Sequence, residues 1–60
     1  MSNRAWSVLC DLVEFHHVTH YADLYAKDVM QEMFDRRLVA MIGNRLILTP
    51  HGLREYYVIN

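Results

Sequence analysis

Four histidines and one cysteine are the side chains of this 60-residue chain that could bind a metal ion. His16 and His20 are four residues apart, a spacing that places two ligands on one face of an unbroken helix. A zinc site needs a third ligand and usually a fourth. Cys10 would lie on another side of that helix, and His17 would point about 100° away from His16. We therefore expect no metal site and no cofactor.

Groups of residues that carry out catalysis are missing from the sequence as well. We find no serine, histidine and aspartate set, no glycine-rich phosphate loop and no pair of carboxylates in a pocket-forming context. A chain of this length has too small an interior to enclose a deep substrate cleft. The sequence does not predict an enzyme.

A third group of side chains, all basic, could bind phosphate. Lys27, Arg36, Arg37 and Arg45 lie near an expected helix and an expected turn, where they would form a modest phosphate-binding patch. Six Lys and Arg stand against seven Asp and Glu, giving a net charge of -1. A strongly basic balance, typical of nucleic-acid-binding domains, is therefore missing. Scattered, solvent-exposed charges are the alternative interpretation of the same residues.

The composition predicts one small ordered domain over residues 1–60. Hydrophobic residues make up 53% of the chain and charged residues 22%, which argues against intrinsic disorder. The single cysteine forms no internal disulfide, and no stretch approaches the roughly 18 apolar residues of a membrane span. The first residues lack the apolar core of a signal peptide. These features predict a soluble, cytoplasmic protein.

The spacing of polar and apolar residues predicts three helices in the first part of the chain. The first extends from residue 2 to about residue 17, because polar residues recur there at steps of three and four. A short second helix is expected over 20–26, with Thr19 as its N-cap, and a third over 27–37. No glycine or proline marks the join, so the sequence leaves open whether these two are separate or one continuous helix. Asp28, Gln31, Glu32, Asp35 and Arg36 are the expected exposed positions of the third helix.

A β-hairpin followed by a last helix is predicted for the remainder. Two apolar runs, 38–42 and 45–49, flank Gly43-Asn44, a pair that supplies the positive φ angles of tight hairpin turns. Thr49 is expected to cap the last helix, with Pro50 at its first position. The predicted fold class is therefore mainly α with a small β-hairpin, an α+β domain.

The first helix carries more apolar surface than a monomer requires. Ala5, Leu9, Leu12 and His16 are expected to face the core, which leaves a second apolar stripe on another side. Tyrosines near the C-terminus are amphipathic and favour interfaces. This stripe has two explanations: the helix is central and buried on two sides, or it pairs with another chain. We expect the second, a homodimer, with the interface residues Trp6, Cys10, Val13, Tyr56 and Tyr57.

The order helix, short helix, helix, hairpin, helix resembles the winged helix-turn-helix family. Residues 34–39, Phe-Asp-Arg-Arg-Leu-Val, resemble the end of that family's third helix. Residues 45–53, which contain Leu-Thr-x-x-Gly, resemble its second wing strand and the exit into the next helix. The resemblance covers roughly residues 5–58. It departs at Arg37, where the family usually has glycine, and in a wing turn of only two residues.

The resemblance implies three helices, a two-stranded wing and a C-terminal helix. It also implies a homodimeric regulator of transcription that binds double-stranded DNA. Arginine side chains at 36, 37 and 45 would contact phosphates, while those of Lys27 and Gln31 would reach toward bases. The candidate DNA-binding residues are Lys27, Gln31, Arg36, Arg37, Asn44 and Arg45.

Three acidic residues of the third helix support a different function. Asp28, Glu32 and Asp35 would be repelled by phosphates if this helix entered the major groove. The alternative is a protein–protein interaction module, a small inhibitor or adaptor, that docks a partner protein through its acidic third helix.

Overall fold

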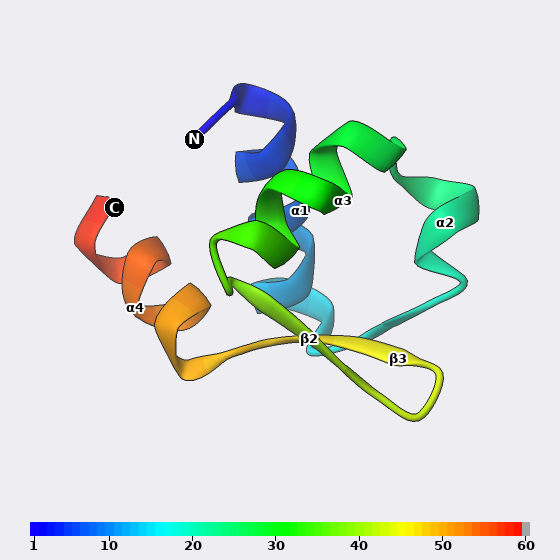
Figure 1. The fold of residues 1–60 in the computed structure, drawn as a ribbon. Coiled ribbons are helices and arrows are strands. Elements are labelled where there is room, and N and C mark those ends of the chain that lie inside the picture. Colours follow the sequence, from blue (N-terminus) through cyan, green and yellow to red (C-terminus); the bar gives the residue numbers. More distant parts are fainter. Residues whose placement is uncertain (60) are drawn as a thin grey trace.

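The computed structural model describes residues 1–59, which fold into four helices and a three-stranded antiparallel sheet. This arrangement confirms the predicted α+β class. Figure 1 shows the elements in chain order: α1 (Asn3–Phe15), β1 (Val18–Thr19), α2 (Tyr21–Leu24), α3 (Lys27–Asp35), β2 (Val39–Ile42), β3 (Arg45–Leu48) and α4 (Pro50–Ile59). Within residues 1–59, no helix has the length and apolar character that crossing a bilayer requires.

The sheet has one more strand than the sequence predicts. Its order is β1-β3-β2, so the central strand β3 pairs with β2 on one side and β1 on the other. Val18 pairs with Leu46, and Thr19 pairs with Arg45. Thr19 is therefore a strand residue and not the cap of the second helix. Two β-branched residues suit the free edge of β3, but a strand this short has no periodicity that sequence patterns can reveal.

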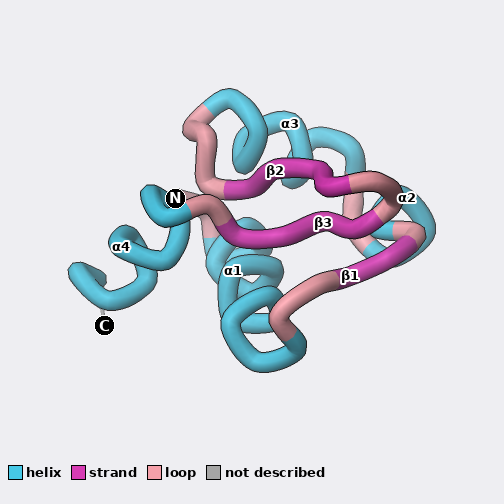
Figure 2. The backbone as a smooth tube through the Cα atoms, turned by 90° about the horizontal axis from the view of Figure 1, so that it is seen from below, coloured by secondary structure: helices cyan, strands magenta, loops and turns pink. Residues whose placement is uncertain are grey.

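The core lies between the sheet and the helices α1 and α3, which cover the same face of the sheet (Figure 2). Three of the expected core residues of the first helix, Ala5, Leu9 and Leu12, are buried as predicted. His16 is not: its φ of 73° ends α1 and its side chain is exposed. The buried residues are Ala5, Val8, Leu9, Leu12, Val29, Met30, Met33, Leu38, Val39 and Leu46.

Three residues with positive φ make the helices shorter than predicted. His16, His20 and Arg37 have φ values of 73°, 54° and 58°, which no α-helix accommodates. The first helix therefore ends at Phe15, the second begins after His20, and the third ends at Asp35. At the start of α1, the Ser2 hydroxyl accepts a hydrogen bond from the Ala5 N–H at 3.2 Å.

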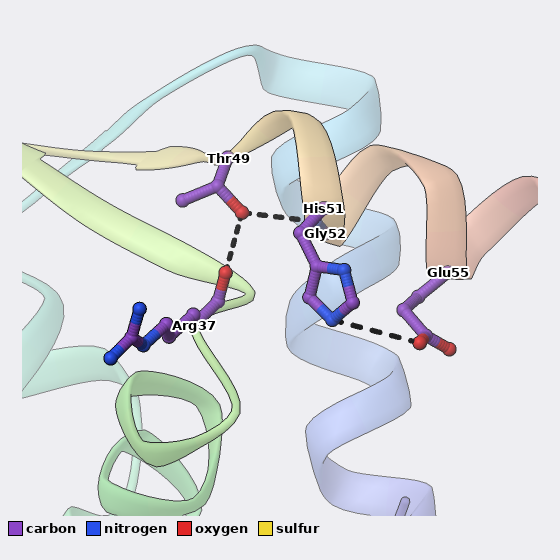
Figure 3. A network of polar contacts seen from close by, with 5 residues as sticks. All are labelled: Arg37, Thr49, His51, Gly52 and Glu55. Atoms are coloured by element: carbon purple, nitrogen blue, oxygen red, sulfur yellow. Dashed lines mark hydrogen bonds and ion pairs between the residues drawn. The ribbon is translucent and has the colours of Figure 1, made fainter.

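Thr49 joins the last helix to the end of α3, and its predicted capping role is confirmed. Its Oγ1 accepts a hydrogen bond from the Gly52 N–H at 2.9 Å and donates one to the Arg37 carbonyl at 2.6 Å (Figure 3). The Thr49 N–H also donates to the Leu38 carbonyl at 3.1 Å. The Leu-Thr-x-x-Gly sequence thus holds α4 against the connection between α3 and β2.

Arg37 stands where the resemblance leads one to expect glycine, and its backbone explains the preference. Left-handed φ costs an L-residue about 1–2 kcal/mol, while glycine loses about 0.5–1 kcal/mol of extra entropy on folding. We therefore expect Arg37→Gly to raise the free energy of unfolding by roughly 0.5 kcal/mol, measured by urea denaturation. Arg36→Gly is the matched control, because Arg36 has a φ of -87° and should lose stability. Equal losses in both variants would contradict this explanation.

Candidate nucleic-acid interface

Helix α3 exposes one side of its surface while the other packs on the core. Val29, Met30 and Met33 are its buried residues. Lys27 and Gln31, one helical turn apart, are exposed and line the same cavity of about 600 Å³ between α2 and α3. The structure therefore brings together the two residues that the sequence assigns to base contacts.

The turn between β2 and β3 is exposed to solvent. Gly43 has a φ of 61°, and the adjacent Asn44 and Arg45 are exposed, as the predicted tight turn requires. Arg45 pairs with Ile42 of β2 and with Thr19 of β1. Because it is held between two strands, the backbone position of Arg45 is well defined while its side chain is exposed.

The basic residues are divided between the two ends of the hairpin. Arg36 and Arg37 are exposed and lie directly after α3, before β2 begins. Arg45 lies beside Ile42 at the far end of β2, a strand of four residues and therefore about 13 Å long. One of the two sequence interpretations places all four basic residues in one patch, whereas the fold separates Arg37 from Arg45 by the length of this strand. A span of this size corresponds to roughly four base-pair steps of duplex DNA.

The acidic residues are engaged within the fold more than the basic ones. Asp11 accepts a hydrogen bond from the Tyr25 hydroxyl at 2.9 Å, and Glu55 lies 3.7 Å from His51 (Figure 3). Among residues 1–59, no carboxylate lies within 4.0 Å of any of the six Lys and Arg side chains. These cations are available to an external anion.

Glu32 does not belong to the exposed acidic side of α3. Its carboxylate accepts hydrogen bonds from the Ser2 hydroxyl at 3.1 Å and the Ser2 N–H at 3.3 Å, and the residue is half-buried. The predicted exposed position is therefore wrong, because α3 packs beside the N-terminus of α1, where a carboxylate meets unpaired N–H groups. Only Asp28 and Asp35 remain exposed acidic residues of α3.

Tyr25 connects α1 to the segment between α2 and α3. Burial and the hydrogen bond to Asp11 raise the pKa of the Tyr25 phenol from 10.0 to about 12. The folded protein therefore holds this proton more tightly than the unfolded chain does. The stability that this group contributes is fully present below about pH 10 and is lost as the pH rises toward 12.

We expect the free energy of unfolding to fall more steeply between pH 10 and 12 in the natural sequence than in Tyr25→Phe. The variant has no phenol at this position and therefore no proton to lose. Urea denaturation at closely spaced pH values measures the difference, and both proteins keep the other three tyrosines. Parallel curves over this interval would show that Tyr25 is not linked to folding.

The expected dimer residues lie on two neighbouring helices. Trp6 of α1 stacks on Tyr56 of α4, with ring centroids 5.4 Å apart and planes within 12°. Tyr57 meets Tyr56 edge to face at 5.5 Å and is 68% exposed. Cys10 and Val13 are half-buried on α1. Sequence reasoning placed Trp6 outside the core, but Tyr56 covers part of it. On α4, Leu53 and Val58 are exposed apolar residues that sequence reasoning missed, and other exposed apolar side chains lie elsewhere, at Phe15, Leu24, Met41 and Ile42.

The histidines are arranged differently from a metal site. His16 and His20 lie on either side of β1 and not on one helical face. No three His, Cys, Asp or Glu side chains among residues 1–59 are grouped to hold an ion.

No protein-family model, curated protein or solved structure matches the chain.

Proposed function

We propose that this protein is a winged helix-turn-helix domain that binds double-stranded DNA as a homodimer and regulates transcription. The observation that carries the proposal is α3, a helix with one exposed side that follows a short helix and precedes a hairpin with Asn44 and Arg45 at its turn. The order of the helices, the hairpin and α4 agrees with the resemblance described above. The third strand β1 is compatible with it, because it extends the hairpin without covering α3.

In this proposal α3 lies in the major groove, which is wide enough to admit an α-helix. Lys27 would donate to the O6 and N7 acceptors of guanine, and Gln31 would pair with the N6 and N7 positions of adenine. The exposed residues Arg36, Arg37 and Arg45 would contact phosphates on either side of the groove. Among residues 1–59, no carboxylate lies within 4.0 Å of these basic side chains, which supports their proposed roles.

Two copies would bind together through α4 and the neighbouring part of α1. The support is the aromatic stack Trp6–Tyr56–Tyr57, which extends from a half-buried residue to an exposed one. A two-fold dimer uses the same patch on each copy, and the two α3 helices would then contact two half-sites of DNA.

We expect Tyr57→Glu to convert the proposed dimer to a monomer at about 100 μM, because burying the new charge at an interface is costly. The melting temperature should fall by no more than a few degrees, because the Tyr57 side chain is exposed. Size-exclusion chromatography with light scattering measures the mass. Ile42→Glu is the matched control, since Ile42 is 63% exposed but lies on the hairpin. A monomeric natural sequence at this concentration would contradict the dimer.

The alternative function, a module that docks a basic partner through an acidic third helix, has less support. Its three proposed carboxylates are reduced to two by the contact of Glu32 with Ser2. The remaining pair, Asp28 and Asp35, is seven residues apart, so these carboxylates lie at the two ends of α3.

Light scattering with and without a 25-base-pair random duplex tests the proposed function. At about 50 mM salt we expect a complex that contains two chains per duplex, which dissociates as the salt concentration is raised. A protein that elutes separately from the duplex at this salt concentration would overturn the proposal.

A further inference from the structure

The cavity between α2 and α3 is a groove with an apolar floor. The rings of Tyr21 and Phe34, both in its lining, meet edge to face with their centroids 5.9 Å apart. Tyr25 and Met30 complete the apolar lining. The hydroxyl of Tyr25 donates a hydrogen bond to Asp11 of α1, so this tyrosine presents its ring, and not a free polar group, to the groove. A volume of about 600 Å³ accommodates several apolar side chains.

Three polar residues of α3 line the groove at intervals of four positions. Lys27 stands at the first residue of the helix, Gln31 one turn later and Asp35 at the last residue. An interval of eight residues separates the two charges by about 12 Å along the helix axis. Both charged side chains are exposed, and neither has an opposite charge within 4.0 Å among residues 1–59.

We infer that this groove binds an amphipathic helix of a partner protein that carries a carboxylate at one end of its apolar stripe and a cation at the other. The apolar residues of the partner helix would fill the floor, as helix-in-groove recognition requires. Its carboxylate would meet Lys27, and its cation would meet Asp35. Duplex DNA contacted by Lys27 and Gln31 would leave the apolar floor of the groove unfilled, whereas the apolar stripe of a helix would cover it.

The inference rests on the proposed function in one respect. Lys27 and Gln31 both line the groove and are the proposed base-contacting residues. A helix bound there would cover them, so the partner would release the protein from DNA. Binding of the helix itself does not depend on DNA and is measured without it.

Three labelled helical peptides with one shared Leu stripe test the inference by fluorescence anisotropy on the full chain. The matched peptide has Glu at one end of the stripe and Arg at the other, while two controls have Glu at both ends or Arg at both ends. Because each control has the same charge at both ends, it places like charges together at one end of the groove in either binding direction. We expect the matched peptide to bind about tenfold more tightly than either control, because each control replaces one attractive pair of charges with a repulsive pair.

Exchanging a charge on the protein should redirect this preference. Asp35→Lys makes both ends of the groove positive and should select the Glu/Glu peptide, whereas Lys27→Glu should select the Arg/Arg peptide. Ala22→Glu, at an exposed lining position, should weaken all three peptides by obstructing the groove without disturbing the core. Circular dichroism confirms that each variant is folded.

The outcomes separate this inference from the proposed function. Equal affinity for the three peptides, or no binding at 1 mM peptide, overturns the groove as a helix site even if duplex DNA still binds. Matched-peptide binding by a protein that fails to bind duplex overturns the proposed function and leaves the groove in place. Where both bind, the matched peptide should displace the duplex, and simultaneous binding of the two would contradict the regulatory role.

Discussion

Replacing Gly52 with alanine is expected to lower the free energy of unfolding by about 3 kcal/mol, which is comparable to the whole stability of a domain of this size. A Cβ atom at this position would lie 2.9 Å from the carbonyl carbon of Leu38 and closer still to its oxygen. That oxygen already accepts the Thr49 N–H, so moving it away would break the contact between α4 and the α3–β2 connection. The gain in helix propensity, about 1 kcal/mol, is too small to compensate. Thermal and urea denaturation measure the loss.

Gly43→Ala is the matched control for this substitution. Nothing lies within 4 Å of a Cβ built on Gly43, but its φ of 61° is unfavourable for alanine. The free energy of unfolding of this variant should be lower by only about 1 kcal/mol. A Gly52→Ala protein as stable as Gly43→Ala would show that α4 can move away from Leu38 at little cost.

Replacing Arg45 with alanine is expected to weaken duplex binding roughly 60-fold at 0.1 M salt. Each phosphate contact contributes about 0.9 to the slope of log K against log salt, which is about eightfold in affinity at this concentration, and a dimer loses two contacts. The loss should be the same for every duplex sequence, because phosphate contacts carry no base information. Fluorescence anisotropy over a series of salt concentrations measures both the affinity and the slope.

Arg54→Ala is the matched control, since it removes the same charge from an exposed position on α4. Figures 1 and 2 show α4 at the opposite end of the molecule from the β2–β3 turn. This variant should lose less than about threefold in affinity, through net charge alone. Equal losses for Arg45→Ala and Arg54→Ala would mean that the hairpin turn does not contact the duplex.

The parts of the fold that the sequence predicts correctly are those with strong local preferences. Gly43-Asn44 identified the hairpin because glycine tolerates the positive φ that a tight turn requires, although only Gly43 adopts a positive φ and Asn44 does not. Thr49 and Pro50 identified the start of α4, because threonine favours the N-cap and proline, with its fixed φ, favours the first helical position. The buried residues Ala5, Leu9 and Leu12 followed from helical periodicity.

The parts that sequence patterns missed depend on contacts between distant segments. Val18 and Thr19 form a strand only because β3 offers them a free edge. Glu32 is held by Ser2, thirty residues earlier in the chain, and local spacing has no information about such a contact. The groove between α2 and α3 requires the placement of Tyr21 against Phe34, a contact between residues thirteen positions apart that local spacing does not reveal.

Titration of ¹⁵N-labelled protein with a 25-base-pair duplex, followed residue by residue by NMR, tests the proposed DNA-binding face most directly. At about 50 mM salt we predict that the largest amide shifts fall on α3, around Lys27 and Gln31, and on the turn at Asn44 and Arg45, while the amides of α4 shift little. Spectra that remain unchanged at saturating duplex, or shifts concentrated on α4 with α3 unaffected, would contradict the proposed interface.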